Sequence, residues 1–210
     1  MIKILIADDH AIVREGLKQI VADTSDMVVG GEAVNGQEVL EQVRKKDWDL
    51  ILLDIAMPGR GGLDILKQLR SERPGLPVLM LSIYPEEQYA VRALKAGASG
   101  YLTKESAPEE LIAAIRKVSQ GKKYVSSSLA EKLAVYLETD TEKQVHEMLS
   151  DREYQVMLMI ASGKTVKIIA DELSLSVKTI STYRARTLEK MGMKNNAELT
   201  YYAVKQGLVD

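Results

Sequence analysis

Residues 49–59 read Asp-Leu-Ile-Leu-Leu-Asp-Ile-Ala-Met-Pro-Gly, and the rest of the chain is best understood from this segment. The continuous apolar run 50–53 is typical of a strand buried on both faces of a parallel sheet. It ends at Asp54, and Pro58-Gly59 then predicts a turn. An acid directly after a buried strand lies at the carboxyl edge of the sheet, where open α/β sheets bind ligands. A plain strand end with a solvated aspartate fits this fragment equally well, so the neighbouring segments must decide.

Hydrophobic periodicity extends this pattern over about the first 120 residues. Apolar runs predict five strands, and 3.6-residue periodicity predicts a helix after each of them. The strands are expected at 2–7, 27–33, 50–53, 78–81 and 99–102. Because crossovers between parallel strands are right-handed, helices cover both faces of such a sheet. The sequence therefore predicts an α/β fold, a flavodoxin-like, doubly wound, five-stranded parallel sheet of order 2-1-3-4-5.

In that strand order, three carboxylates meet at one end of the sheet. Asp8 and Asp9 follow the first strand, and Asp54 follows the third. Carboxylates this close repel one another, and oxygen ligands completed by water suit Mg²⁺ better than zinc. Lys104 brings an ammonium group and Ser82 a hydroxyl to the same edge. A carboxylate flanked in this way is suited to attack phosphorus, because the cations can then hold the new phosphoryl oxygens.

This part of the chain resembles a two-component receiver domain. The family pattern is an acidic pair after the first strand, D-x-x-M-P-G after the third, Ser or Thr after the fourth, and aromatic-x-x-Lys at the fifth. The sequence has these motifs in order, as Asp8-Asp9, 54–59, Ser82 and 101–104. A flavodoxin-like domain with an unrelated acidic cluster is the alternative, but four motifs on the expected elements favour a receiver.

The resemblance implies a role for each of these residues. Asp54 would be the phosphoacceptor, with a sensor histidine kinase as the phosphoryl donor. Ser82 and Lys104 would bind the phosphoryl group, and Tyr101 would be the aromatic switch that moves inward. The groups that would hold Mg²⁺ or its waters are Asp8, Asp9, Asp54 and the backbone carbonyl of Ala56.

The last 60 residues or so predict helices and no strand. Ser150, followed three residues later by Glu153, is a capping-box pattern that opens the first helix. Further helices are expected at 166–173, 177–191 and 196–206. An all-α four-helix unit with a tight turn between its second and third helices fits a helix-turn-helix domain.

The third of these helices, 177–191, has two different faces. Ile180, Leu188 and Met191, with Thr187 beside them, form a stripe that is expected to face the core. The opposite side carries Lys178, Thr182, Ala185, Arg186 and Glu189, with Ser181 at its edge. Small and hydrogen-bonding side chains let a helix enter a major groove deeply, while basic ones at its margins reach phosphates. A solvated helix face with incidental charges is the alternative for an isolated amphipathic helix.

The segments 149–153, 168–173, 177–180 and 188–192 together resemble a LuxR-type helix-turn-helix. With the receiver, the whole chain resembles a NarL/FixJ-family response regulator. The resemblance places base-reading positions on Ser181, Thr182 and Ala185, and candidate DNA-backbone contacts on Lys178, Arg184 and Arg186. In this family the last helix is a dimer contact, and two-fold symmetry would match two DNA half-sites.

Arg184 departs from the family pattern, because an apolar residue is commoner at that position of the stripe. Our hypothesis is that its side chain snorkels, or pairs with Glu153 inside the same module.

The resemblances divide the chain into a receiver domain (1–121), a helix and linker (122–148) and a LuxR-type helix-turn-helix domain (149–210). The polar stretch 138–146 predicts the flexible part of the linker. Residues 1–121 carry a net charge of −3, whereas residues 143–210 carry +2. The contrast is mild, and it supports a nucleic-acid partner for the C-terminal end.

Composition excludes several other kinds of protein. The chain has no cysteine, which excludes disulfides and thiolate metal sites, and its two histidines make a histidine-built zinc site a poor fit. No apolar run approaches the roughly 20 residues of a membrane span. No signal peptide precedes the first strand, so we expect a cytoplasmic protein with no membrane partner.

The predicted function is a phosphorylation-controlled transcription factor, not an enzyme. It would bind double-stranded DNA and form a homodimer when phosphorylated. A phosphatase or phosphotransferase built on Asp54 is disfavoured because Ala56 stands where its general acid would be. A protein-binding regulator without DNA binding is the other alternative, and salt-dependent retention on duplex DNA separates it from the first.

Overall fold

The computed structural model describes residues 1–138 and 144–209. The chain divides into two compact units, residues 1–133 and 134–210. Within the described residues no helix is both long and apolar enough to cross a membrane. The predicted domain boundaries at residues 121 and 149 stay predictions.

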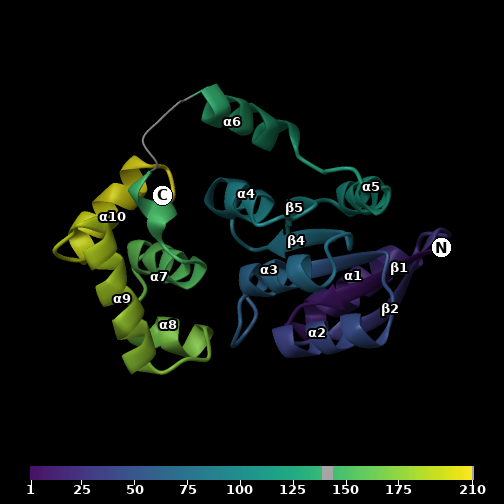
Figure 1. The fold of residues 1–210 in the computed structure, drawn as a ribbon, viewed down its shortest axis with the longest axis horizontal. Coiled ribbons are helices and arrows are strands. Elements are labelled where there is room, and N and C mark those ends of the chain that lie inside the picture. The colour runs from purple at the N-terminus through teal and green to yellow at the C-terminus, as the bar shows by residue number, and fades with distance from the viewer. Residues whose placement is uncertain (139–143, 210) are drawn as a thin grey trace. The chain divides into compact units, whose positions relative to one another are not determined.

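The first unit is a parallel five-stranded sheet with helices on both sides (Figure 1). The strand order is β2-β1-β3-β4-β5, which confirms the predicted doubly wound α/β fold. The strands are β1 (Ile2–Ala7), β2 (Met27–Ala33), β3 (Leu50–Asp54), β4 (Val78–Ser82) and β5 (Gly100–Thr103). The helices are α1 (Ala11–Ala22), α2 (Gly36–Lys45), α3 (Gly62–Glu72), α4 (Glu86–Lys95) and α5 (Pro108–Ser119).

The side chains of the central strands alternate between two apolar layers. One layer packs against α1 and α5, and its strand residues include Ile4, Leu50, Leu52 and Leu79. On the other side α2 packs on β2 and on α3, while α4 packs on β5. Because both faces are covered, β3 is completely buried, as its continuous apolar run predicts.

The register of the sheet places the ends of four strands next to one another. Ala7 pairs with Leu53 across β1 and β3, so Asp8 comes out of the sheet beside Asp54. Asp54 pairs with Leu81 on β4, and Ser82 pairs with Thr103 on β5. The topology therefore brings the predicted site residues to a single edge.

The connector between the units is partly helical. After α5 the chain returns to the sheet, where the Tyr124 amide donates to the Ser99 carbonyl at 2.8 Å, and then forms α6 (Ser127–Glu138). Residues 139–143 of the predicted linker lie outside the described residues. The linker prediction is wrong at its end, because η1, a 3₁₀ helix (Val145–Met148), holds a buried His146 whose Nδ1 lies 2.9 Å from the Tyr202 hydroxyl.

After the end of α6, the described part of the second unit contains η1 and four α-helices. These are α7 (Asp151–Ala161), α8 (Val166–Glu172), α9 (Val177–Met191) and α10 (Asn196–Lys205). The predicted capping box is present on α7: the Ser150 side chain accepts from the Glu153 amide, and the Glu153 carboxylate accepts from the Ser150 amide. The helical prediction for this unit is confirmed.

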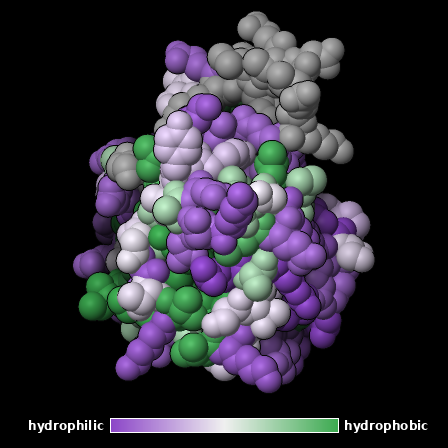
Figure 2. Space-filling view, turned by 90° about the vertical axis from the view of Figure 1, so that its left-hand side faces the viewer, coloured by the Kyte–Doolittle hydropathy of each residue, from purple (hydrophilic) through white to green (hydrophobic). Residues whose placement is uncertain are grey.

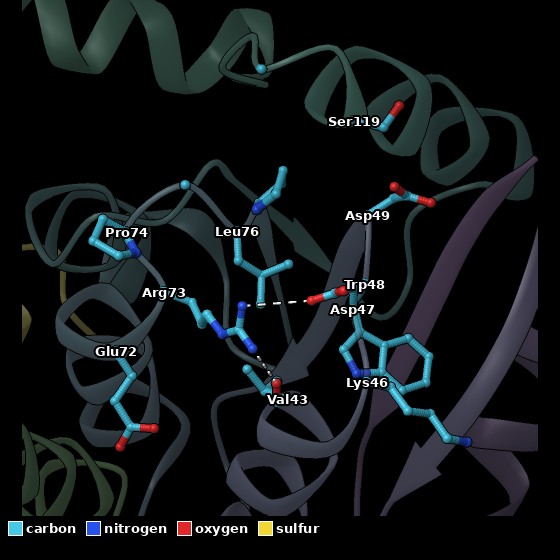
Figure 3. A pocket seen from close by; sticks show the side chains of 13 residues that line it. Val43, Lys46, Asp47, Trp48, Asp49, Glu72, Arg73, Pro74, Leu76 and Ser119 are labelled. Atoms are coloured by element: carbon cyan, nitrogen blue, oxygen red, sulfur yellow. Dashed lines mark hydrogen bonds and ion pairs between the residues drawn. The ribbon is translucent and has the colours of Figure 1, made fainter.

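A cavity of about 540 Å³ opens at the amino-terminal edge of the sheet, where β3 and β4 begin (Figure 3). Arg73 extends into it, with Nη1 3.5 Å from Asp47 Oδ1 and Nη2 donating to the Val43 carbonyl at 3.4 Å. None of the predicted phosphoryl-binding or metal-binding residues lines this cavity.

Candidate functional site

The carboxyl edge of the sheet holds two buried carboxylates that share one ammonium group. The Asp8 side chain is 1% exposed and the Asp54 side chain is fully buried. Lys104 Nζ lies 2.7 Å from Asp8 Oδ2 and 2.9 Å from Asp54 Oδ2. Two acids and one base leave the buried group with a net negative charge before any cation is added.

The environment of Asp54 works against its ionisation. Burial is the largest effect and raises the pKa of Asp54; Lys104 opposes the rise, and the neighbouring Asp8 adds to it. Burial would lower the pKa of Lys104, but the two carboxylates outweigh it and hold that pKa above its usual value. The ammonium group is therefore charged and is the main local stabiliser of an ionised Asp54.

The loop after β3 helps to position the Asp54 carboxylate through its backbone. The Ala56 amide donates to Asp54 Oδ1 at 3.2 Å, and the Gly62 amide donates to the Ile55 carbonyl at 2.9 Å. A Cβ on Gly62 would lie 2.1 Å from the Asp54 carbonyl oxygen, so only glycine allows α3 to begin this close to the acid. Gly59 has φ of 73°, a left-handed conformation that glycine adopts without strain.

Ser82 and Tyr101 lie on the β4 and β5 side of the same edge. Ser82 is buried, and its Oγ accepts a hydrogen bond from the Tyr84 amide at 3.0 Å. The Tyr101 ring is fully buried, and its hydroxyl donates to the Tyr84 carbonyl at 2.7 Å. The loop residue Tyr84 thus connects the predicted phosphoryl ligand to the predicted aromatic switch, and the ring occupies an inward position.

Asp9 and His10 complete the acidic edge on its solvent side. Ligand atoms of Asp8, Asp9, His10 and Asp54 all lie within 4.8 Å of one another. Asp8 Oδ2 and Asp54 Oδ2 are buried and share the Lys104 ammonium group, at 2.7 and 2.9 Å. Buried oxygens with lone pairs to spare, in a cluster of excess negative charge, are donors that a divalent cation requires. The residues present therefore fit a metal ion.

The surface of α9 follows the predicted division into two faces. Ile180, Thr187, Leu188 and Met191 are buried. The residues exposed on the other side include Lys178, Ser181, Thr182, Ala185 and Arg186. Figure 2 looks onto the side of the molecule that carries α9 and α10, where the surface is largely hydrophilic with scattered apolar side chains.

The hypothesis that Arg184 pairs with Glu153 is wrong. Arg184 Nε donates to Asn196 Oδ1 at 2.6 Å, so its side chain runs to the start of α10. Glu153 pairs with Lys190 instead, with Nζ 2.7 Å from Oε2. The reason is geometric: residue 190 reaches the capping box of α7, whereas residue 184 does not.

Two residues of interest were missed from the sequence. The small number of histidines argues against a zinc site and gives His10 no role. Its position directly after the acidic pair is the signal that it lies at the site. Val177 opens α9 with an apolar side chain that is 51% exposed, next to Lys178. Periodicity alone gave no reason to expect an exposed valine there.

Comparison with known proteins agrees with this architecture. The model of the response regulator receiver domain matches residues 4–116, and that of the bacterial regulatory proteins of the luxR family matches residues 147–203. The chain therefore belongs to the two-component response regulators, and within them to the NarL/FixJ family, whose members join a receiver to a LuxR-type DNA-binding domain. It is a DNA-binding transcriptional regulator and not an enzyme.

Individual relatives match along the whole chain. Response regulator GacA of Pseudomonas syringae pv. syringae (strain B728a) is 38% identical, covering 100% of this chain and 99% of its own. Response regulator UvrY of Escherichia coli (strain K12) is 36% identical, covering 99% and 96%. Among solved structures, RcsB of Salmonella enterica serovar Typhimurium, bound to promoter rprA with the phosphomimetic BeF₃⁻, has a TM-score of 0.66 and 26% identity over 97% of this chain and 99% of its own.

Proposed function

We propose that Asp54 is the phosphoacceptor and that its phosphorylation by a sensor histidine kinase controls DNA binding by the C-terminal unit. The observation that carries the proposal is the shared ion pair, in which Lys104 lies within 2.9 Å of both Asp8 and Asp54. A buried acid with a cation already beside it is suited to accept a phosphoryl group.

The chemistry of the step follows from these positions. An Asp54 carboxylate oxygen attacks phosphorus, the new oxygen–phosphorus bond forms, and the bond between phosphorus and the kinase histidine nitrogen breaks. Lys104 turns from the carboxylates to a phosphoryl oxygen, and the Ser82 hydroxyl donates to another. When Ser82 turns, the Tyr84 amide loses its present acceptor, which gives the loop that carries Tyr84 a reason to rearrange, and the Tyr101 hydroxyl donates to that loop.

We assign the metal site of this proposal to Asp8, Asp9, Asp54 and the Ala56 carbonyl, with Mg²⁺ as the ion. The bound cation supplies positive charge that offsets the excess of carboxylates and of phosphoryl oxygens. The support is the donor set itself, which is oxygen-rich, partly buried and in excess of the one ammonium charge beside it.

The C-terminal unit reads DNA in this proposal through the exposed face of α9. Ser181, Thr182 and Ala185 contact base edges, while Lys178, Arg184 and Arg186 contact phosphates. RcsB, which resembles this chain, has been solved as two dimers bound to two parallel DNAs. Tyr201 is 70% exposed on α10 and Val204 is also exposed, so α10 has apolar surface for the expected homodimer. We place the protein in the cytoplasm, where its kinase and its DNA would meet.

The first prediction tests the phosphoacceptor. The full chain incubated with acetyl phosphate and Mg²⁺ is expected to gain one phosphoryl group, detected as a mass shift on the intact protein. Asp54→Ala is expected to gain none, because the nucleophilic oxygen is missing. Asp23→Ala, which removes an exposed acid at the end of α1, serves as the matched control and should label like the wild type. Labelling that persists in Asp54→Ala would move the acceptor to another residue.

A further inference from the structure

His10 turns its imidazole toward the acidic pair instead of toward its own helix. It stands at the N-cap of α1 but makes no side-chain capping bond. Its amide donates to Asp8 Oδ1 at 2.8 Å, and its Nδ1 lies 3.2 Å from that same oxygen and 2.9 Å from Asp9 Oδ1. The ring is 61% exposed, so packing does not force this orientation.

We propose that His10 Nδ1 is a metal ligand, so that the site is a mixed carboxylate–imidazole site which prefers divalent transition ions such as Mn²⁺ to Mg²⁺. This inference rests on the proposed metal site at Asp8, Asp9 and Asp54, and it adds a nitrogen donor to that all-oxygen set.

The separations between the donor atoms fit a common ion. Two neighbouring ligands of an octahedral ion, each at about 2.1 Å, lie about 3 Å apart. The distances from His10 Nδ1 to Asp9 Oδ1 and to Asp8 Oδ1, 2.9 and 3.2 Å, bracket this value. His10 Nδ1 is therefore placed beside both carboxylates, at the spacing that ligands of one ion would have.

The charge balance of the buried part of the cluster favours a bound cation. Asp8 and Asp54 are almost wholly buried, and the Oδ2 atoms of both face the same ammonium group. Lys104 supplies a single positive charge for both. With Asp9, the cluster holds three carboxylates, so a divalent ion would bring it close to neutrality.

The nature of the donors decides which ion is preferred. Mg²⁺ takes oxygen ligands almost exclusively, whereas imidazole suits first-row transition ions and their affinities rise along the series from Mn²⁺. An all-oxygen site distinguishes weakly between Mg²⁺ and Mn²⁺, whereas one imidazole ligand raises the affinity for Mn²⁺ relative to that for Mg²⁺. His10→Gln therefore weakens Mn²⁺ binding more than Mg²⁺ binding.

The composition of the chain allows a bound imidazole to be assigned to one residue. The protein has only two histidines and no cysteine. The other histidine, His146, lies in the C-terminal unit with its Nδ1 2.9 Å from the Tyr202 hydroxyl. An imidazole nitrogen coupled to a bound Mn²⁺ therefore identifies His10 once His146 has been replaced.

The experiment uses the full chain loaded with Mn²⁺ and measured by pulsed electron spin-echo spectroscopy. We expect ¹⁴N modulation from a coordinated imidazole in the wild type and in His146→Gln, and its loss in His10→Gln. Circular dichroism checks that each variant is folded. If Mn²⁺ binds but the wild type gives no imidazole modulation, His10 is not a ligand and the inference fails while the proposed carboxylate site stands.

Calorimetric titration with Mn²⁺ and Mg²⁺ alone provides the second readout. We expect His10→Gln to lose about tenfold in Mn²⁺ affinity and less than about twofold in Mg²⁺ affinity. Equal losses for the two ions would overturn the preference, because they would show that His10 only holds the carboxylates in place. If neither ion binds the wild type, the inference and the proposed metal site both fail.

Discussion

At the scale of single residues, the function depends on carboxylates that the fold buries away from water, where ionisation is unfavourable. Asp54 is fully buried beside Asp8, and one Lys104 serves both. Such a site is destabilising until it binds a cation, because burial disfavours each ionised carboxylate. Reactivity and stability are therefore opposed at Asp54, as is common for functional sites.

The stability of the metal-free protein is expected to rise in Asp54→Asn. The amide keeps an oxygen for the Ala56 amide while removing the buried charge, and we expect a gain of about 1 kcal/mol in the free energy of unfolding at pH 7. Urea unfolding followed by the fluorescence of Trp48, which is the single tryptophan and is buried in the first unit, measures this difference.

The same comparison has a definite pH dependence. Because the pKa of Asp54 is raised in the folded state, ionisation destabilises the fold only as pH rises above the ordinary carboxyl value of about 4. The difference in the free energy of unfolding between Asp54→Asn and the wild type should therefore disappear as pH falls toward 4. A variant no more stable than the wild type at pH 7 would show that Lys104 fully offsets the burial of Asp54.

At the scale of elements, helix starts hold the functional groups in position. α3 begins against the backbone of Asp54, the N-cap of α1 is the residue that follows the acidic pair, and α7 begins in a capping box that Lys190 on α9 joins. Burial opposes ionisation of Glu153, but the bonds from Lys190 and Ser150 outweigh it and lower its pKa. The capping box therefore ties α7 to α9 as well as capping the start of α7.

Gly62→Ala is expected to destabilise the first unit by about 1–3 kcal/mol, because the new Cβ meets backbone atoms that cannot move aside. Its nearest neighbours are the Asp54 carbonyl oxygen at 2.1 Å and the Ile55 Cα at 2.9 Å. Urea unfolding with Trp48 fluorescence gives the cost, and acetyl phosphate labelling of the folded variant should be slowed.

The matched control is Gly75→Ala. A Cβ on Gly75 meets nothing within 4 Å, so this change should stay within about 0.5 kcal/mol of the wild type. If the two alanine variants were equally stable, close packing of α3 on the Asp54 backbone would not be what positions the acid.

Lys178→Ala tests the face of α9 through the salt dependence of DNA binding. Each lost phosphate contact lowers the slope of log affinity against log salt by about one. We expect that decrease for Lys178→Ala on a random-sequence duplex, measured by fluorescence anisotropy at several salt concentrations.

Lys122→Ala removes the same charge from an exposed position in the first unit and should leave the slope unchanged. If both variants lowered the slope equally, the effect would reflect net charge and not contact by α9.

At the scale of the whole molecule, the first unit carries the chemical switch and the second carries the DNA-binding surface. Phosphorylation can change DNA affinity only if the phosphorylated site favours one arrangement of the protein over another. The connector that joins them includes α6 and the η1 helix, whose His146 bonds to Tyr202 on α10. The end of the connector is therefore attached to the helix that is expected to form the dimer.

Beryllofluoride with Mg²⁺ is expected to raise the affinity of the full chain for a site selected from random DNA by at least fivefold, a modest coupling energy of about 1 kcal/mol. Asp54→Ala should bind the same site with no response to beryllofluoride, because the fluoride complex needs the carboxylate. Electrophoretic mobility shift with and without the reagent measures both. An identical response in the two proteins would separate DNA binding from the Asp54 site.

The sequence by itself determined the order of elements, the doubly wound sheet and the residues that gather at its carboxyl edge. Apolar runs and helical periodicity decide which side of an element is buried, and right-handed crossovers then place helices on both faces of a parallel sheet. Helix α9 could be predicted for the same reason, since its buried stripe repeats with the helical period.

Only the tertiary structure decided which partners these side chains choose. Lys104 bridges Asp8 and Asp54, His10 turns toward the acidic pair, and Arg184 bonds to Asn196 while Lys190 takes Glu153. Periodicity gives the direction of a side chain from its own element but not the distance to a group on another one. That distance depends on how the elements pack, which is why the chemistry of the site could be predicted from the sequence and its contacts could not.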